Sequence, residues 1–141
     1  MSNPRTIRTA LVARLRTIAG LHAYERWPGQ LNPPCIVVDL IDAEPEQAMG
    51  AVGARLTRYD FDLNIMMPLA GGWENAQDRL DPLLATSSTG GVFGAIAGDR
   101  TLGGTVHSTF VKGLPRDYER RVIDESIEVL AATVPIEIWA S

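Results

Sequence analysis

Polar and apolar residues alternate most regularly near the middle of the chain, in residues 56–67. The odd positions carry Tyr59, Phe61, Leu63, Ile65 and Met67, and the even positions carry Arg58, Asp60, Asp62 and Asn64. A period of two predicts a strand with one buried and one solvated face. At about 3.3 Å per residue this strand is about 40 Å long, roughly twice the usual length, so we expect part of it to project beyond its sheet.

Three segments have helical spacing. The first begins at Asn3 and Pro4, because asparagine caps free backbone amides and proline suits the first helical position, and it ends at Gly20. The second covers residues 73–85, with Pro82 weakening its last turns, and the third covers residues 92–97. Their predicted buried residues are Ile7, Leu11, Leu15, Ile18, Ala76, Leu80, Leu83, Leu84, Phe93 and Ile96.

The other apolar segments are typical of strands. Residues 21–27 form a short extended segment, and residues 35–41 are rich in β-branched side chains, which predicts a central strand. Residues 42–55 contain two glycines and little pattern, so the central strand and the long strand form a hairpin with a long tip. Two more strands are predicted at residues 105–111 and 128–139, joined by a polar connection at residues 112–124.

The last two strands carry further detail. In residues 105–111, Val106, Ser108 and Phe110 share one face, and His107 and Thr109 share the other. In residues 128–139 the even positions from 130 to 138 are all apolar, which predicts a buried face. Pro135 cannot donate a backbone hydrogen bond, so we predict an edge position or a bulge there.

The order of elements is helix, three strands, two helices and two strands. The 141 residues, of which 45% are hydrophobic, are enough for one domain (1–141) with a proper core. This order predicts an α+β fold with a mostly antiparallel sheet, helices packed on one face and a long β-hairpin arm. Such an open sheet leaves unpaired edges, which a neighbouring subunit can cover.

Charge and cysteine usage exclude several classes of protein. A net charge of −4 and an isoelectric point near 5.1 argue against a surface built to hold nucleic acid. Cys35 is the single cysteine, which excludes an intrachain disulfide and a cysteine-rich zinc site and suits a reducing cytoplasm. We expect no signal segment and no membrane span, since no apolar run approaches about 18 residues.

No residue pattern marks a catalytic or metal site. His22 and His107 are each isolated from other ligands at metal-binding spacing. Asp60 and Asp62 share a strand face and can in principle hold a divalent cation or transfer protons, but a solvated polar face is the simpler interpretation. The hydroxyl residues at 86–89 lack a nucleophile elbow, and the glycine pairs lack phosphate-loop spacing. We therefore predict no catalytic residue, no cofactor and no metal.

Several segments share their order and spacing with a known family. They are Ile18-Ala19-Gly20-Leu21, Asn32-Pro33-Pro34 with Ile36-Val37-Val38, Tyr59-Asp60-Phe61, Ala76-Gln77-Asp78-Arg79-Leu80-Asp81, and Gly91, Ile96 and Thr101-Leu102-Gly103-Gly104-Thr105-Val106. In these segments the chain resembles the tail terminator family of long-tailed (siphovirus-like) bacteriophages, part of the head-to-tail connector group. The resemblance covers nearly the whole chain from about residue 10 and rests on scaffold features.

The resemblance implies a structural subunit that assembles in the host cytoplasm into a ring, typically a hexamer, at the head-proximal end of the tail in the virion. The ring would stop tail polymerisation and bind the tail tube protein and a head-closure or neck protein, while DNA passes through its lumen without specific binding. An acidic lumen would favour passage. The lumen charge stays open because of Arg8, Arg14, Arg16, Arg116, Arg120 and Arg121.

Aromatic and arm residues near the ends of elements are candidates for subunit or partner contacts. These candidates are Tyr24, Trp27, Met49, Val52, Arg55, Trp73, Arg116 and Tyr118. Three alternative functions stay open. The chain could be another neck component, such as a head-closure or tail-completion protein, a small-molecule-binding α+β domain, or a small enzyme using Asp60, Asp62 or His107.

Overall fold

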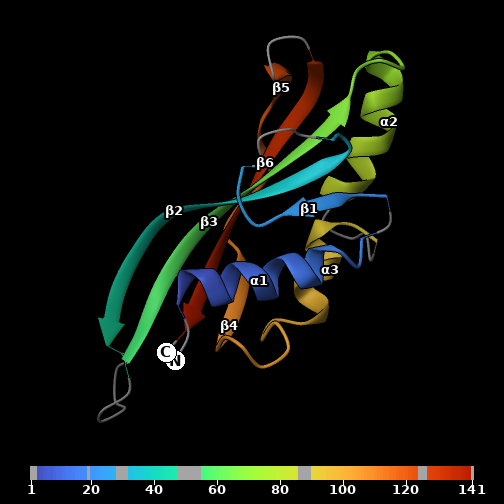
Figure 1. Cartoon of the computed structure of the whole chain (residues 1–141). Coiled ribbons are helices and arrows are strands. Elements are labelled where there is room, and N and C mark those ends of the chain that lie inside the picture. Colours follow the sequence, from blue (N-terminus) through green and yellow to red (C-terminus); the bar gives the residue numbers. More distant parts are fainter. Residues whose placement is uncertain are drawn as a thin grey trace.

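The computed structural model describes residues 3–18, 20–27, 32–47, 55–85, 90–123 and 127–140. Within these residues the predicted α+β fold is confirmed, with three helices and a curled, mostly antiparallel sheet of six strands (Figure 1). The helices are α1 (Pro4–Leu15), α2 (Trp73–Leu84) and α3 (Val92–Gly98). The strands are β1 (His22–Tyr24), β2 (Cys35–Gln47), β3 (Arg55–Pro68), β4 (Ser108–Val111), β5 (Arg116–Ile123) and β6 (Ile127–Ala140).

The long strand predicted at residues 56–67 is β3, and it lies at the centre of the sheet. β3 and β6 are each 14 residues long and pair antiparallel over most of their length. β2 pairs with the other side of β3, and β1 adds to β2 in parallel. β4 and β5 both pair with the far side of β6, so they occupy one edge of the sheet, one after the other.

The paired part of the hairpin arm is longer than predicted. β2 does not end at residue 41 but pairs with β3 as far as Gln47, opposite Arg55. The predicted contacts Met49 and Val52 lie outside the described residues. Figure 1 shows the paired ends of β2 and β3 projecting past the helices, as the length of the predicted strand indicated.

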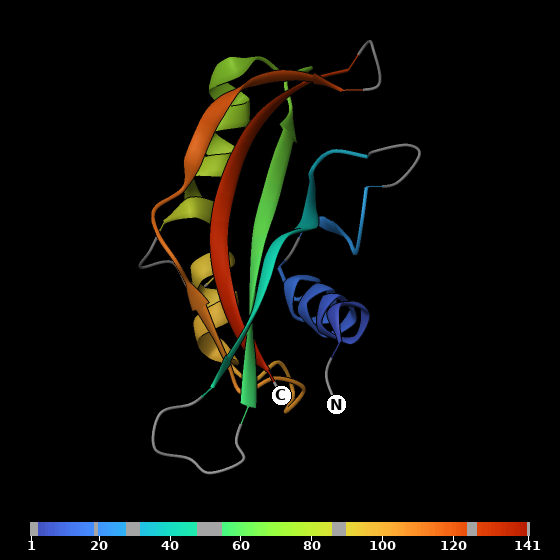
Figure 2. The same cartoon turned by 90° about the vertical axis from the view of Figure 1, so that its left-hand side faces the viewer.

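The main core lies between the sheet and the three helices, and Figure 2 shows the sheet curling alongside them. α1 starts at the predicted cap, since the Asn3 Oδ1 accepts the Thr6 N–H at 2.9 Å. The apolar face of β3 packs in the main core, with Phe61 1% exposed. The even positions of β6 pack there too, as predicted, and the fully buried helix residues are Ile7, Leu11, Leu15, Ala76, Leu80 and Val92.

The opposite face of the sheet, called the open face below, is not polar throughout. Met66 is buried on it, because its neighbours in register on β2 and β6 are Cys35 and Ala131. Asn64 is only 8% exposed and accepts a hydrogen bond from the Thr133 hydroxyl at 3.2 Å. The prediction of a solvated face is therefore wrong at this end of β3, where three strands together form a second, smaller apolar cluster.

The polar connection predicted at residues 112–124 is wrong, because residues 116–123 form the edge strand β5. Its first five side chains are exposed, so no buried face imposes an apolar alternation on its sequence. β4 is also shorter than predicted and begins at Ser108. Thr109 is its buried side chain, whereas Phe110 pairs with Glu137 and is 41% exposed.

Pro135 does not lie on an edge strand, since β6 is paired on both sides. It lies instead at the junction between β4 and β5. Ile136 is opposite Val111 of β4, and Thr133 is opposite Arg116 of β5. The Pro135 carbonyl accepts the Lys112 N–H at 2.8 Å, while the missing N–H of proline faces the gap between the two short strands. Proline is tolerated because the partner edge is interrupted there.

Candidate interaction surface

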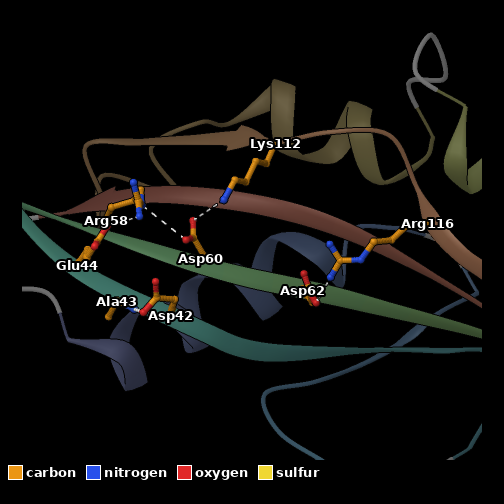
Figure 3. Close-up of polar contacts among 8 residues, drawn as sticks. All are labelled: Asp42, Ala43, Glu44, Arg58, Asp60, Asp62, Lys112 and Arg116. Carbon is orange, nitrogen blue, oxygen red and sulfur yellow. Dashed lines mark hydrogen bonds and ion pairs between the residues drawn. The ribbon is translucent and has the colours of Figure 1, made fainter.

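The middle of the open face carries a row of ion pairs, shown in Figure 3. β2, β3, the connection between β4 and β5, and β5 itself all contribute to it. We call it the charged row; its members are Glu44, Arg58, Asp60, Asp62, Lys112 and Arg116.

Asp60 lies between two cations in the charged row. Its Oδ1 is 3.6 Å from the Lys112 Nζ, and its Oδ2 is 3.6 Å from the Arg58 Nε. Arg58 also pairs with Glu44, its neighbour in register on β2. These contacts connect β2, β3 and the segment after β4 into one network across the sheet.

Asp62 forms the second centre of the charged row. Its Oδ2 is 2.5 Å from the Arg116 guanidinium. Burial raises the pKa of the Asp62 carboxyl above its ordinary value. The charge and hydrogen bond of Arg116 oppose this rise, and Asp39 and Asp117 add to it. Asp62 therefore lies in a partly dehydrated environment shared by three carboxylates and one guanidinium.

The sequence-based interpretation of Asp60 and Asp62 as freely solvated carboxylates is wrong. Their side chains are only 14% and 16% exposed, because the long cationic side chains of Arg58, Lys112 and Arg116 lie beside them. Lys112 and Arg116 are half-exposed, so each of their pairs contributes about 0–1 kcal/mol to stability. The charged row therefore connects β3 to the β4–β5 edge but adds little to stability.

The outer edge of β2 is the longest unpaired backbone edge among the described residues. β1 pairs only with Cys35, Ile36 and Val37, while β2 continues to Gln47. A register shift between Leu40 and Asp42 marks a β-bulge on this edge. Bulges and charged residues are devices by which proteins block indiscriminate strand pairing. The edge can therefore bind a partner whose surface fits the bulge and the charges, while indiscriminate strand pairing is disfavoured.

The predicted contact residues divide into exposed and covered ones. Trp27 and Trp73 are 48% and 44% exposed, whereas Tyr24 packs against the smaller apolar cluster. Arg55 is the first residue of β3, at the arm. Other large apolar side chains that are exposed, and that the sequence did not single out, are Ile41, Phe110, Leu114 and Val122. Nothing in the sequence indicated that these side chains are exposed, because an apolar residue in a sequence can be either buried or exposed in the fold.

Tyr118 joins β5 to a helix. Its hydroxyl donates a hydrogen bond to the Asp81 carboxylate on α2 at 2.7 Å. Burial and this hydrogen bond raise the pKa of Tyr118 to about 12. The contact holds the β5 edge against α2, so Tyr118, one of the predicted partner contacts, also has a role inside the subunit.

Replacing Tyr118 with phenylalanine is expected to lower the free energy of unfolding by about 0.5–1.5 kcal/mol. Because the folded pKa is above the unfolded one, this stabilisation is present below about pH 10 and is lost as the pH rises through about 12. Titration of tyrosinate absorbance in the native protein should show one component near pH 12 that is absent from the variant. If the component near pH 12 is still present in the Tyr118→Phe variant, it does not belong to Tyr118 and this assignment is wrong.

The arginines that prevented a prediction of the lumen charge from the sequence lie in different environments. Arg14 donates from Nε to the Ala95 carbonyl at 2.6 Å and so ties α1 to α3, and Arg116 belongs to the charged row. Arg121 pairs with Glu119 at 3.1 Å. Arg5, Arg8, Glu25 and Arg26 line a polar hollow of about 300 Å³ beside α1.

His22 is the first residue of β1 and His107 directly precedes β4, and both are exposed. No group of three or more His, Cys, Asp and Glu residues in this part of the chain is arranged to hold a metal ion. No described helix is long and apolar enough to cross a membrane. The absence of a cofactor and of enzymatic activity stays a prediction.

No protein-family profile matches the chain, and no significant match appears among curated proteins.

Proposed function

We propose that this chain is a structural subunit that forms a ring at the head-proximal end of a phage tail and terminates tail polymerisation. In this proposal the subunit contacts copies of itself, the tail tube protein and a head-closure or neck protein. A hexamer is the expected ring, as the family resemblance implies. DNA passes through the lumen without specific binding, in keeping with the net charge of −4.

The observation that carries this proposal is the arm with its unpaired outer edge. From residue 38 to Gln47 no described strand pairs with the outer side of β2, and the arm projects past the helices (Figure 1). Proteins protect an edge strand of this length with charges and bulges or cover it with another element, and a neighbouring subunit can provide that cover. The β4–β5 edge on the other side of the sheet is also unpaired in the described residues. Two different open edges suit head-to-tail contacts, the kind of contact from which closed rings are built.

Deletion of the gene from the phage that encodes it tests the proposal. Electron microscopy should then show tails of uncontrolled length, and a plasmid copy of the wild-type gene should restore normal length. Tails of normal length that fail to join heads would instead identify the chain as another neck component. Normal, infectious virions without the protein would refute both.

A further inference from the structure

One large apolar side chain on the acidic edge strand β2 is exposed. Ile41 occupies the bulge in β2, between Leu40, which pairs with Phe61, and Asp42, which pairs with Asp60. Its side chain is 57% exposed. A bulge can aim a side chain out of the regular alternation of its strand. We call this exposed side chain, which lies between Asp39 and Asp42 in the sequence of β2, the knob.

A hollow of about 430 Å³, lined mainly by residues with apolar side chains, lies at the opposite edge of the sheet, between α3 and β4. Its lining residues are Phe93, Ile96, Ala97, Arg100, Phe110 and Val111. Ile96 is buried, while Ala97 and Phe110 are exposed. The Arg100 guanidinium lies 5.4 Å from the centroid of the Phe110 ring. The hollow has room for a branched aliphatic side chain, and a cation stands at its rim.

The knob and the hollow lie at the same level of the sheet. One transverse row runs from Leu40 through Phe61 and Ile136 to Val111. The next row runs from Asp42 through Asp60 and Glu137 to Phe110. Ile41 lies between these rows at one edge, and the hollow lies between them at the other. A second copy placed beside the first, without sliding along the strands, brings its knob to this hollow.

The charges around the two features are complementary. Asp39, Asp42 and Glu44 flank the knob, and β2 contains no basic residue. At the hollow, Arg100 has no carboxylate partner among the described residues and donates only to the Thr109 carbonyl at 3.5 Å. Lys112, next to the hollow, is half-exposed and pairs with Asp60 of its own subunit. Asp99 also lies nearby, but its carboxylate accepts from the Gly103 N–H at 2.8 Å. Opposite charges at the rim favour this pairing over others.

From these features we infer that Ile41 of one copy inserts into the hollow between α3 and β4 of the next copy. Asp42 then lies near Arg100 of that copy. The contact joins two different surfaces, so it is head-to-tail, and it builds a ring when the rotation between neighbouring copies closes. This inference rests on the proposed ring function and names the surfaces that build it.

Mixing two broken variants tests the contact. Ile41→Asp removes the knob, and Phe110→Asp places a charge in the hollow. Each variant alone should lose self-association by sedimentation velocity, with the association constant reduced at least about tenfold. Their equimolar mixture should form dimers and nothing larger, because one intact knob meets one intact hollow. Asn75→Asp, which adds a charge at an exposed position on α2, should assemble like the wild type.

Self-association of either single variant at wild-type strength would overturn the inference, and so would a mixture that stays monomeric. If the wild-type protein is monomeric in solution, the contact is tested in purified tails instead. These tails carry the double variant Ile41→Cys and Ala97→Cys and are treated with an oxidant. A ladder of disulfide-linked multimers is expected, and its absence overturns the contact. Cys35 does not compete, since it is buried and burial raises its pKa to about 11.

The inference and the proposed function can fail separately. If phage carrying Ile41→Asp build tails of normal length, the knob contact is refuted while a ring built through other surfaces survives. If deletion of the whole gene leaves tails and virions normal, the proposed function is refuted, whatever the purified protein does in solution.

Discussion

Replacing Leu63 with alanine is expected to lower the free energy of unfolding by about 2–5 kcal/mol. Leu63 is 0% exposed at the centre of β3, where it is opposite Val38 on one side and Val134 on the other. Paired strands on both sides and the helices above leave little room for collapse, so the substitution leaves a cavity. Urea unfolding followed by tryptophan fluorescence measures the change as a lower midpoint with an unchanged slope.

Leu114→Ala is the matched control, because it removes the same atoms from a side chain that is 76% exposed. It should change stability by no more than about 0.5 kcal/mol. Equal losses in the two variants would show that Leu63 does not lie in a close-packed core. Both are measured at one protein concentration, since any self-association adds to apparent stability.

Gly91→Ala is expected to cost about 1–3 kcal/mol through steric overlap rather than through a lost contact. Gly91 is buried and lies just before α3. A Cβ atom there would be 2.7 Å from the Leu83 carbonyl oxygen and 2.9 Å from the Pro82 carbonyl oxygen. Both are backbone atoms at the end of α2, so neither can swing away. Thermal unfolding by circular dichroism should show a lower midpoint.

Gly90→Ala, one residue earlier, is the control. Gly90 is exposed, and a Cβ atom there would meet nothing within 4 Å. Its replacement should be neutral, or stabilising by up to about 1 kcal/mol, because alanine restricts the unfolded chain. If the two variants behaved alike, the close approach of α2 to α3 at Gly91 would be refuted. The sequence gives no reason to distinguish the two glycines, and only the packing of α2 against Gly91 does so.

The strongly patterned elements were predictable, because burial on one face constrains every second or every third to fourth residue. β3 and β6 each keep one apolar face along the main core, so their period of two is visible in the sequence. α1 adds a cap at Asn3 and a proline after it, which are local signals. β5 lacked any such signal, since most of its side chains are exposed on an edge.

The candidate surface was predictable only in part. Trp27 and Trp73 are exposed, as a contact residue must be, but sequence reasoning did not single out Ile41 or Phe110. Ile41 belongs to an apolar run in the sequence and becomes exposed through a one-residue bulge. Bulges depend on how two strands align, which local sequence does not state. The polar alternation of β3 was the one visible sign of the charged row.

The sequence by itself determined the α+β class, the long central strand, the three helices and the acidic balance, because these follow from local periodicity and composition. The tertiary structure alone decided that β4 and β5 share one edge, that Asp60 and Asp62 are covered by cations, and that Ile41 is level with the hollow beside Phe110. Each of these depends on the register between strands distant in sequence. Register is set by the packing of the whole sheet against its helices, not by any single segment.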